Sequence, residues 1–126
     1  MVIIAYWIVA GILALAYLFS GATKLVRSKA QLEASGQRWV SGARPSFVKF
    51  VGVVEILGAL GLILPPAFSI LVILAPLAAI GLVLVQAVAI GVHMQIRDVK
   101  SLPINIVLLI LAFATAWLAV LTLILF

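Results

Sequence analysis

Glu55 is the residue whose position most strongly indicates chemistry in this sequence. It is the only acidic residue inside any of the long apolar segments. An ionisable side chain at membrane depth costs free energy unless it is paired or protonated, so such a residue is by default a candidate for a functional site. The alternative is a charge pair that only locks two helices together, because intramembrane ion pairs also serve as architecture.

Other polar residues lie toward the same side of the predicted membrane as Glu55. Those ending the first apolar segment are spaced i, i+3, i+4, i+7, and those ending the third are seven and four apart, so each set shares a helix face. The candidates for binding a ligand or relaying a proton are Ser20, Thr23 and Lys24 (with Arg27 on the same face), Glu55, Gln86, His93, Arg97, and Asn105 at the start of the fourth segment.

A glutamate, a histidine and nearby cations in a partly dry pocket can pass protons, hold the head of an amphipathic ligand such as a quinone, or anchor a partner subunit. Each residue also has an ordinary interpretation: Lys24 can reach the headgroups, and Gln86 can bridge two helices. His93 is the only histidine, which excludes haem ligation by two histidines of one chain. The sequence has no cysteine, and we find no phosphate loop, metal-ligand pair or nucleophile–base motif in it.

The composition requires a membrane around these residues. The chain is 67% hydrophobic and 9% charged, with a mean hydropathy of +1.46, and its apolar residues form runs long enough to cross a bilayer. We expect an all-α membrane protein, a four-transmembrane antiparallel helix bundle in one domain over residues 1–126. The predicted spans are about 2–23, 47–64, 67–92 and 103–126.

Prolines and polar residues predict the connections between the spans. A short interfacial helix is expected at 29–35, between the first two spans, with Trp39 at headgroup level. Pro65 and Pro66 are expected to end the second span, and Pro76 to kink the third. Pro103 suits the first turn of the fourth span.

Small residues in the second and third spans predict where helices approach closely. Gly and Ala side chains let backbones come together in a membrane, although glycine is also common there without such a role. The residues concerned are Gly52, Gly58, Gly61, Ala78 and Gly81.

The basic residues predict the orientation. The net charge is +5, and six of the eight Lys and Arg residues follow the first span while Arg97 and Lys100 follow the third. This is typical of cytoplasmic loops beside an anionic leaflet and not of nucleic-acid binding. We therefore expect both termini outside and both basic loops in the cytoplasm, in the cell (inner or plasma) membrane. Because no basic region precedes the first apolar run, we expect that run to be a retained helix.

Two stretches resemble a known family. Residues 19–25 (FSGATKL) look like its small-residue–Gly–x–x–Lys signature, and residues 52–62 (GVVEILGALGL) resemble its glycine-flanked glutamate helix. With His93 and Arg97, these are similar to the DoxX and DoxX-like family of small four-helix membrane proteins, over nearly the whole chain. The resemblance implies a site at Lys24, Glu55, His93 and Arg97. Some DoxX-type proteins are subunits of a thiosulfate:quinone oxidoreductase, and others are associated with redox or stress-defence complexes.

We therefore expect an accessory subunit of a bacterial membrane oxidoreductase or other envelope complex, binding quinone or lipid around Glu55. No intrinsic cofactor is expected, and quinone is a candidate ligand. The expected partners are the lipid bilayer, a membrane or redox subunit, and a second copy of the chain in a homo-oligomer. No nucleic acid is expected.

Three alternatives stay open. One is a small proton-coupled transporter of hydrophobic compounds, although the small multidrug resistance family has its glutamate in the first span rather than the second. Another is an autonomous lipid-modifying, isomerase-like enzyme with Glu55 and His93 as acid and base. The last is a purely structural adaptor. Whether the chain is an enzyme is left open by the sequence.

Overall fold

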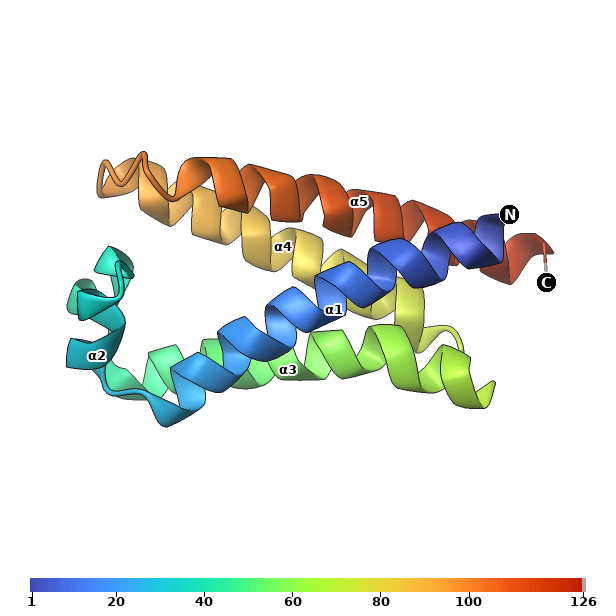
Figure 1. The fold of residues 1–126 in the computed structure, drawn as a ribbon, viewed down its shortest axis with the longest axis horizontal. Coiled ribbons are helices and arrows are strands. Elements are labelled where there is room, and N and C mark those ends of the chain that lie inside the picture. The colour runs from blue at the N-terminus through green and yellow to red at the C-terminus, as the bar shows by residue number, and fades with distance from the viewer. Residues whose placement is uncertain (126) are drawn as a thin grey trace.

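Four long helices dominate the computed structural model, which describes residues 1–125 (Figure 1). All four are long and apolar enough to cross a membrane, and the described residues contain no strand, so the predicted fold class is confirmed. The helices are α1 (Val2–Val26), α2 (Lys29–Ala34), the 3-10 helix η1 (Arg38–Gly42), α3 (Pro45–Phe68), α4 (Leu74–Gln95) and α5 (Leu102–Leu125).

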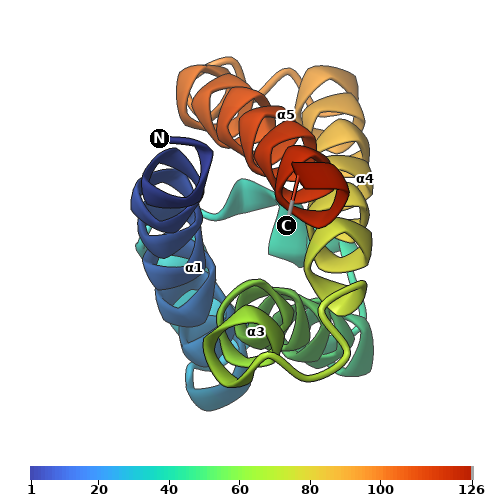
Figure 2. The same ribbon diagram turned by 90° about the vertical axis from the view of Figure 1, so that its right-hand side faces the viewer.

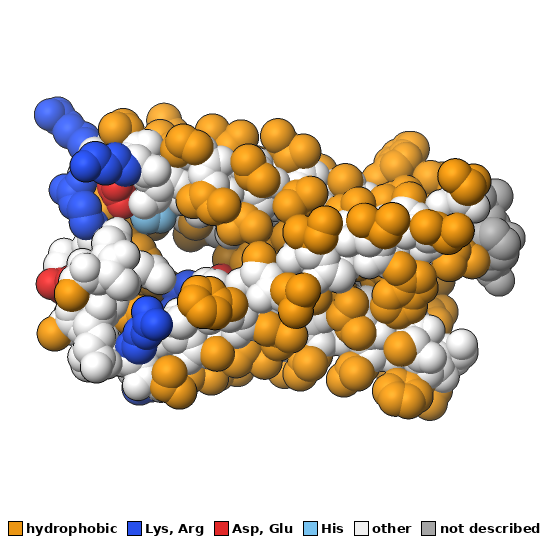
Figure 3. Space-filling view, viewed as in Figure 1, with side chains coloured by type: hydrophobic (Ala, Val, Ile, Leu, Met, Phe, Trp, Pro, Cys, Tyr) orange, Lys and Arg blue, Asp and Glu red, His pale blue; other side chains and the backbone are white. Residues whose placement is uncertain are grey.

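The long helices form a ring in the order α1, α3, α4, α5, which the end-on view shows (Figure 2). Each one contacts its two neighbours, with α1 closing the ring against α5. The start of α1 and the end of α5 lie at one end of the bundle, and the α1–α3 connection lies at the other (Figure 1). We call the latter the basic end, since Lys and Arg side chains gather there (Figure 3).

The α1–α3 connection, residues 28–44, is called the strap below. It contains α2, where the predicted short helix is confirmed, and η1. The Ser28 hydroxyl accepts from the backbone N–H of Gln31 and the Gln31 side chain accepts from that of Ser28, a capping box that begins α2. Leu32 and Val40 pack with Val48 of α3 into a small apolar core, which holds the strap against the bundle.

The main core fills the half of the ring nearest the termini. Its large buried side chains include Leu13, Tyr17, Leu62 and Leu82, and alanines fill much of the rest. Lipid is as apolar as these side chains, so close packing rather than water exclusion holds such helices together. The outer faces carry large exposed apolar residues, as lipid-facing surfaces require.

Most of the predicted small-residue contacts are present. A Cβ added to Gly58 would lie 2.7 Å from a methyl of Leu82, and one added to Gly61 would lie 2.9 Å from the Ala78 Cβ. The prediction is wrong for Gly81, where an added Cβ would meet no atom within 4 Å. Glycine content alone does not tell which face of a helix meets its neighbour, and Gly81 faces open space.

The second span does not end at Pro65 and Pro66, as the sequence had suggested. Helix α3 continues through both prolines to Phe68 and ends at Ser69, which adopts a left-handed conformation (φ 54°). Pro66 has no N–H for the carbonyl of Leu62, four residues earlier. The hydroxyl of Tyr6 in α1 donates to that carbonyl instead, at 2.5 Å, so a neighbouring helix replaces the missing bond.

The third span also begins later than predicted, at Leu74 instead of residue 67, and it extends to Gln95. Pro76 is therefore the third residue of α4 and lies in its first turn. Backbone N–H groups of a first turn have no partner within the helix, so proline removes no bond there. The predicted kink at Pro76 is wrong for this reason, whereas Pro103 does lie in the first turn of α5.

We predict that Tyr6→Phe lowers the free energy of unfolding by about 1–3 kcal/mol, because it leaves the buried Leu62 carbonyl without a donor. The measurement is reversible unfolding in mixed micelles. The matched control is Trp7→Phe, which alters an aromatic residue on the outer face of the same turn. Equal stability of the two variants would contradict this account of how α3 passes its prolines.

Candidate functional site

The closest approach of α1 and α3 is a contact between two glycines. A Cβ added to Gly21 would lie 2.6 Å from the carbonyl oxygen of Gly52, and one added to Gly52 would lie 2.9 Å from that of Gly21. Neither position tolerates a side chain at this spacing. Lys24 lies three residues after Gly21 and Glu55 three residues after Gly52, about one helical turn along each helix. Because α1 and α3 run in opposite directions, these turns lie on opposite sides of the glycine contact. The Cβ of Lys24 lies beside Gly52, and its side chain extends back along α1 toward Ser20, where it reaches Glu55.

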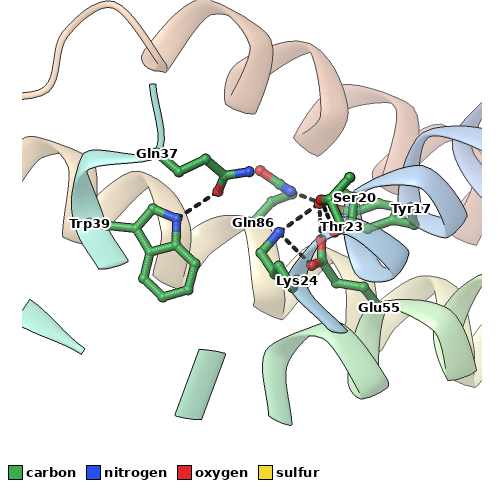
Figure 4. Close-up of polar contacts among 8 residues, drawn as sticks. All are labelled: Tyr17, Ser20, Thr23, Lys24, Gln37, Trp39, Glu55 and Gln86. Atoms are coloured by element: carbon green, nitrogen blue, oxygen red, sulfur yellow. Dashed lines mark hydrogen bonds and ion pairs between the residues drawn. The ribbon is translucent and has the colours of Figure 1, made fainter. Parts of the chain in front are cut away.

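Lys24 and Glu55 form a buried ion pair (Figure 4). The Lys24 Nζ lies 2.7 Å from Glu55 Oε1, and the two residues are only 6% and 4% exposed. Ser20 completes a triangle: its hydroxyl donates to Glu55 Oε2 (3.0 Å) and accepts from Lys24 Nζ (2.6 Å). Lys24 therefore points into the bundle and does not extend to the headgroups.

A second polar contact crosses the ring from α4 to α1. Gln86 Nε2 donates to the hydroxyl of Tyr17 at 2.6 Å, and both side chains are buried. The other amide atom, Gln86 Oε1, has no hydrogen-bond partner among the described residues. The same is true of Asn105 Nδ2 at the start of α5.

The third polar contact joins His93 near the end of α4 to Asp98 in the α4–α5 loop. His93 Nδ1 lies 3.1 Å from Asp98 Oδ2, to which the Ser101 hydroxyl also donates (2.9 Å). Arg38 of the strap approaches Oδ1 at 4.0 Å. Burial raises the pKa of the Asp98 carboxyl, but the hydrogen bonds from Ser101 and His93 and the electrostatic interactions with His93 and Arg38 lower it more. The net pKa lies below its usual range.

Asp98 was not among the residues chosen from the sequence. It is 3% exposed although it lies in a short loop with Arg97 and Lys100. A loop acid between two basic residues resembles an ordinary solvated charge. The one available signal was its distance of five residues from the only histidine, which the end of a helix can bring within hydrogen-bond reach.

One cavity of about 700 Å³ lies at the basic end of the ring, and most of these polar residues line it: Ser20, Lys24, Glu55, Gln86, His93, Ser101 and Asn105. Gln37 and Trp39 of the strap form part of its wall, and Figure 3 shows a hollow between the strap and the α4–α5 pair. The apolar wall includes Phe19, Leu84 and Ile104, whose side chains are exposed. Because Figure 3 views the bundle from the side, its hollow indicates that the cavity opens sideways, toward the surface that lipid would cover.

The structure brings together most of the site residues predicted from the sequence. Two of them lie elsewhere: the Thr23 hydroxyl donates to the backbone carbonyl of Ser20, and Arg97 is exposed with a left-handed backbone (φ 58°). Tyr17, Trp39 and Asp98 are additions that only the structure shows. The predicted residues that line the cavity are Ser20, Lys24, Glu55, Gln86, His93 and Asn105.

The fold and the cavity define a small four-span membrane protein with a polar site enclosed by its helices. A sequence model of the DoxX-like family matches residues 8–115, so the chain belongs to the DoxX-like family, as its motifs had suggested. Neither the curated proteins nor the solved structures provide a match to this chain.

We predict that Gly21→Ala lowers the free energy of unfolding by about 1–3 kcal/mol, because its Cβ would force α1 and α3 apart. Gly91→Ala is the control, since a Cβ there would meet no atom within 4 Å. Thermal unfolding in lipid nanodiscs measures both. If the two variants were equally stable, the glycine contact would not be what positions Lys24 and Glu55.

Proposed function

We propose that this protein is an accessory membrane subunit that binds an uncharged amphipathic ligand of the quinone or lipid class. The observation that carries this proposal is the cavity of about 700 Å³, whose wall combines a few polar groups with apolar helix faces. Cavities of about 300–1,000 Å³ with such walls are typical of small-molecule sites. The ligand head lies among the polar residues, and its apolar tail leaves through the sideways opening.

The charges of the cavity wall support an uncharged head group. Lys24 is paired with Glu55, and His93 is hydrogen-bonded to Asp98, so the lysine of the cavity wall already has its carboxylate. An ionic ligand would have to displace one of these pairs or remain uncompensated in a medium of low dielectric constant, which is costly. The unpartnered amide atoms of Gln86 and Asn105 offer hydrogen bonds without charge.

The role as a subunit is supported by how little of the chain projects beyond its helices. Apart from the strap, the described residues outside the four long helices form only short connections. The sequence has no cysteine for thiol redox chemistry, so in a redox complex electrons reach the ligand from a partner. Membership of the DoxX-like family agrees with this role. The strap and the α4–α5 loop lie on the cytoplasmic side of a bacterial inner membrane, as their basic residues indicate.

One contact favours a second candidate, an isomerase-like enzyme that acts on a lipid. His93 and Asp98 are hydrogen-bonded at the cavity wall, an arrangement that orients an imidazole for acid–base work. Glu55 is not part of it, because its carboxylate contacts Lys24 and Ser20. In this candidate, His93 with Asp98 replaces the pair of Glu55 and His93 inferred from the sequence. A chain that converts a bound lipid without any partner would establish the enzyme.

We predict that native mass spectrometry after gentle extraction finds an uncharged quinone or lipid bound to the wild type, together with a stoichiometric partner subunit. The double variant Gln86→Leu/Asn105→Leu should lose the small molecule, because it removes the unpartnered amide groups that hold the ligand head. Leu57→Val, on the outer face of α3, serves as the control and should keep it. Equal ligand content in all three proteins would contradict the proposal, and a lone ligand-bearing chain would favour the enzyme.

A stability measurement separates this proposal from a purely structural role. Glu55→Leu alone leaves Lys24 buried without its carboxylate, which should cost about 3–5 kcal/mol. The double variant Lys24→Met/Glu55→Leu should recover most of that loss, since an apolar pair of similar volume is often as stable as a buried ion pair. Unfolding of the wild type and both variants in nanodiscs measures this. If the double variant were less stable than Glu55→Leu, the ion pair would have a purely structural role.

A further inference from the structure

The tautomer of His93 determines what the cavity offers to a ligand. A carboxylate only accepts hydrogen bonds, so the contact between Asp98 and His93 places the proton on Nδ1. In the neutral imidazole the other nitrogen, Nε2, is then a bare acceptor. No hydrogen bond within the described part of the chain occupies Nε2, and His93 lines the cavity. By holding the proton on Nδ1, Asp98 thus leaves His93 Nε2 free to accept a hydrogen bond from the ligand.

The two unpartnered amides add a donor and an acceptor. Asn105 is 8% exposed and has a free Nδ2, and it lies in the first turn of α5, beside the end of α4 that carries His93. Gln86 is 4% exposed and has a free Oε1. It lies seven residues before His93, about 10 Å deeper along α4. Exchanging the two ends of the Gln86 amide would leave a free N–H there, which a hydroxyl can also satisfy.

We propose that this pattern selects a head group bearing hydroxyls, such as a quinol, over the corresponding dicarbonyl. A hydroxyl donates to His93 Nε2 and accepts from Asn105 Nδ2, so one group satisfies both. A carbonyl can accept from Asn105 but leaves His93 Nε2 facing an acceptor. A site that leaves a buried polar group unpaired discriminates strongly against the ligand that lacks the matching group. This inference rests on the proposed function, which supplies the ligand class.

The charged groups around His93 each have a partner within the protein. Asp98 contacts its ring, and Arg38 of the strap reaches His93 only through Asp98. Lys24 of α1 and Glu55 of α3 line the same cavity but are paired with each other. The α5 wall contributes the neutral Asn105. None of these supplies a free cation that would favour a carbonyl oxygen.

The test compares three probes that share one decyl tail: a substituted benzoquinone, its quinol, and the dimethyl ether of that quinol. Their dissociation constants are measured by anaerobic titration of the protein in nanodiscs, with empty nanodiscs subtracted. The quinol should bind tighter than both others by about tenfold or more. Equal binding of all three, or tighter binding of the quinone, would overturn the inference and leave the proposed function standing. Binding of none would overturn both.

Two variants identify the residues responsible. His93→Phe should weaken quinol binding about tenfold and leave quinone binding nearly unchanged. In Asp98→Asn the side-chain amide can donate to Nδ1, which moves the imidazole proton to Nε2, so the preference should shift toward the quinone. A purely structural role of Asp98 would not shift the preference toward the quinone.

Met94→Leu, an exposed neighbour of His93 outside the cavity wall, is the matched control and should keep the wild-type preference. If His93→Phe does not fold, the shift in preference in Asp98→Asn still decides the assignment. Retention of the full quinol preference in either variant would overturn the role given to His93.

Discussion

The contact between Gly21 and Gly52 is the constraint on which the site depends. Without side chains at these positions, the α1 and α3 backbones come close enough for the long Lys24 side chain to extend along the helix contact and reach Glu55. A larger distance between the α1 and α3 backbones would leave both charges unpaired inside the membrane, where an unpaired charge costs much free energy. Ser20 closes the triangle, so each charged group has its counterpart within the pair of helices.

The ring of helices divides into two halves with different tasks. Near the termini, alanines and a few large side chains fill the interior, and the Tyr6 hydroxyl supports α3 where prolines interrupt its backbone bonding. Near the basic end the helices diverge around the cavity, and the strap covers it with Gln37 and Trp39. The packed half thereby provides the rigid base that a site on diverging helices requires.

The cavity presents polarity without net charge, and this property links the architecture to the proposed ligand. The charge of Lys24 is balanced by the Glu55 carboxylate, and His93 is hydrogen-bonded to Asp98, while amide atoms of Gln86 and Asn105 remain free. A head group entering from the lipid needs hydrogen bonds and no counter-ion in such a place. The tautomer of His93 adds a further condition, because its Nε2 accepts a hydrogen bond and therefore favours a ligand head with a hydroxyl.

Much of this protein follows from its sequence alone. Apolar runs of membrane length determined four crossing helices, the isolated Glu55 marked the site, and short motifs indicated the family to which the chain belongs. The capping residues of α2 and the place of Pro103 were also local signals. These features depend on composition and on neighbours within a few residues, so they can be predicted without knowledge of the fold.

Only the tertiary structure decided the rest, because it depends on contacts between residues far apart in the chain. Helix α3 continues through Pro65 and Pro66, and the Tyr6 hydroxyl of α1 donates to the Leu62 carbonyl, for which Pro66 has no N–H. Pro76 removes no backbone hydrogen bond, because α4 begins later than its apolar run suggested. Arg97 turns away from the cavity while Asp98, which looked like a solvated loop charge, is buried against His93. Which polar groups remain unpaired, and therefore what a ligand must supply, is likewise a property of the folded bundle.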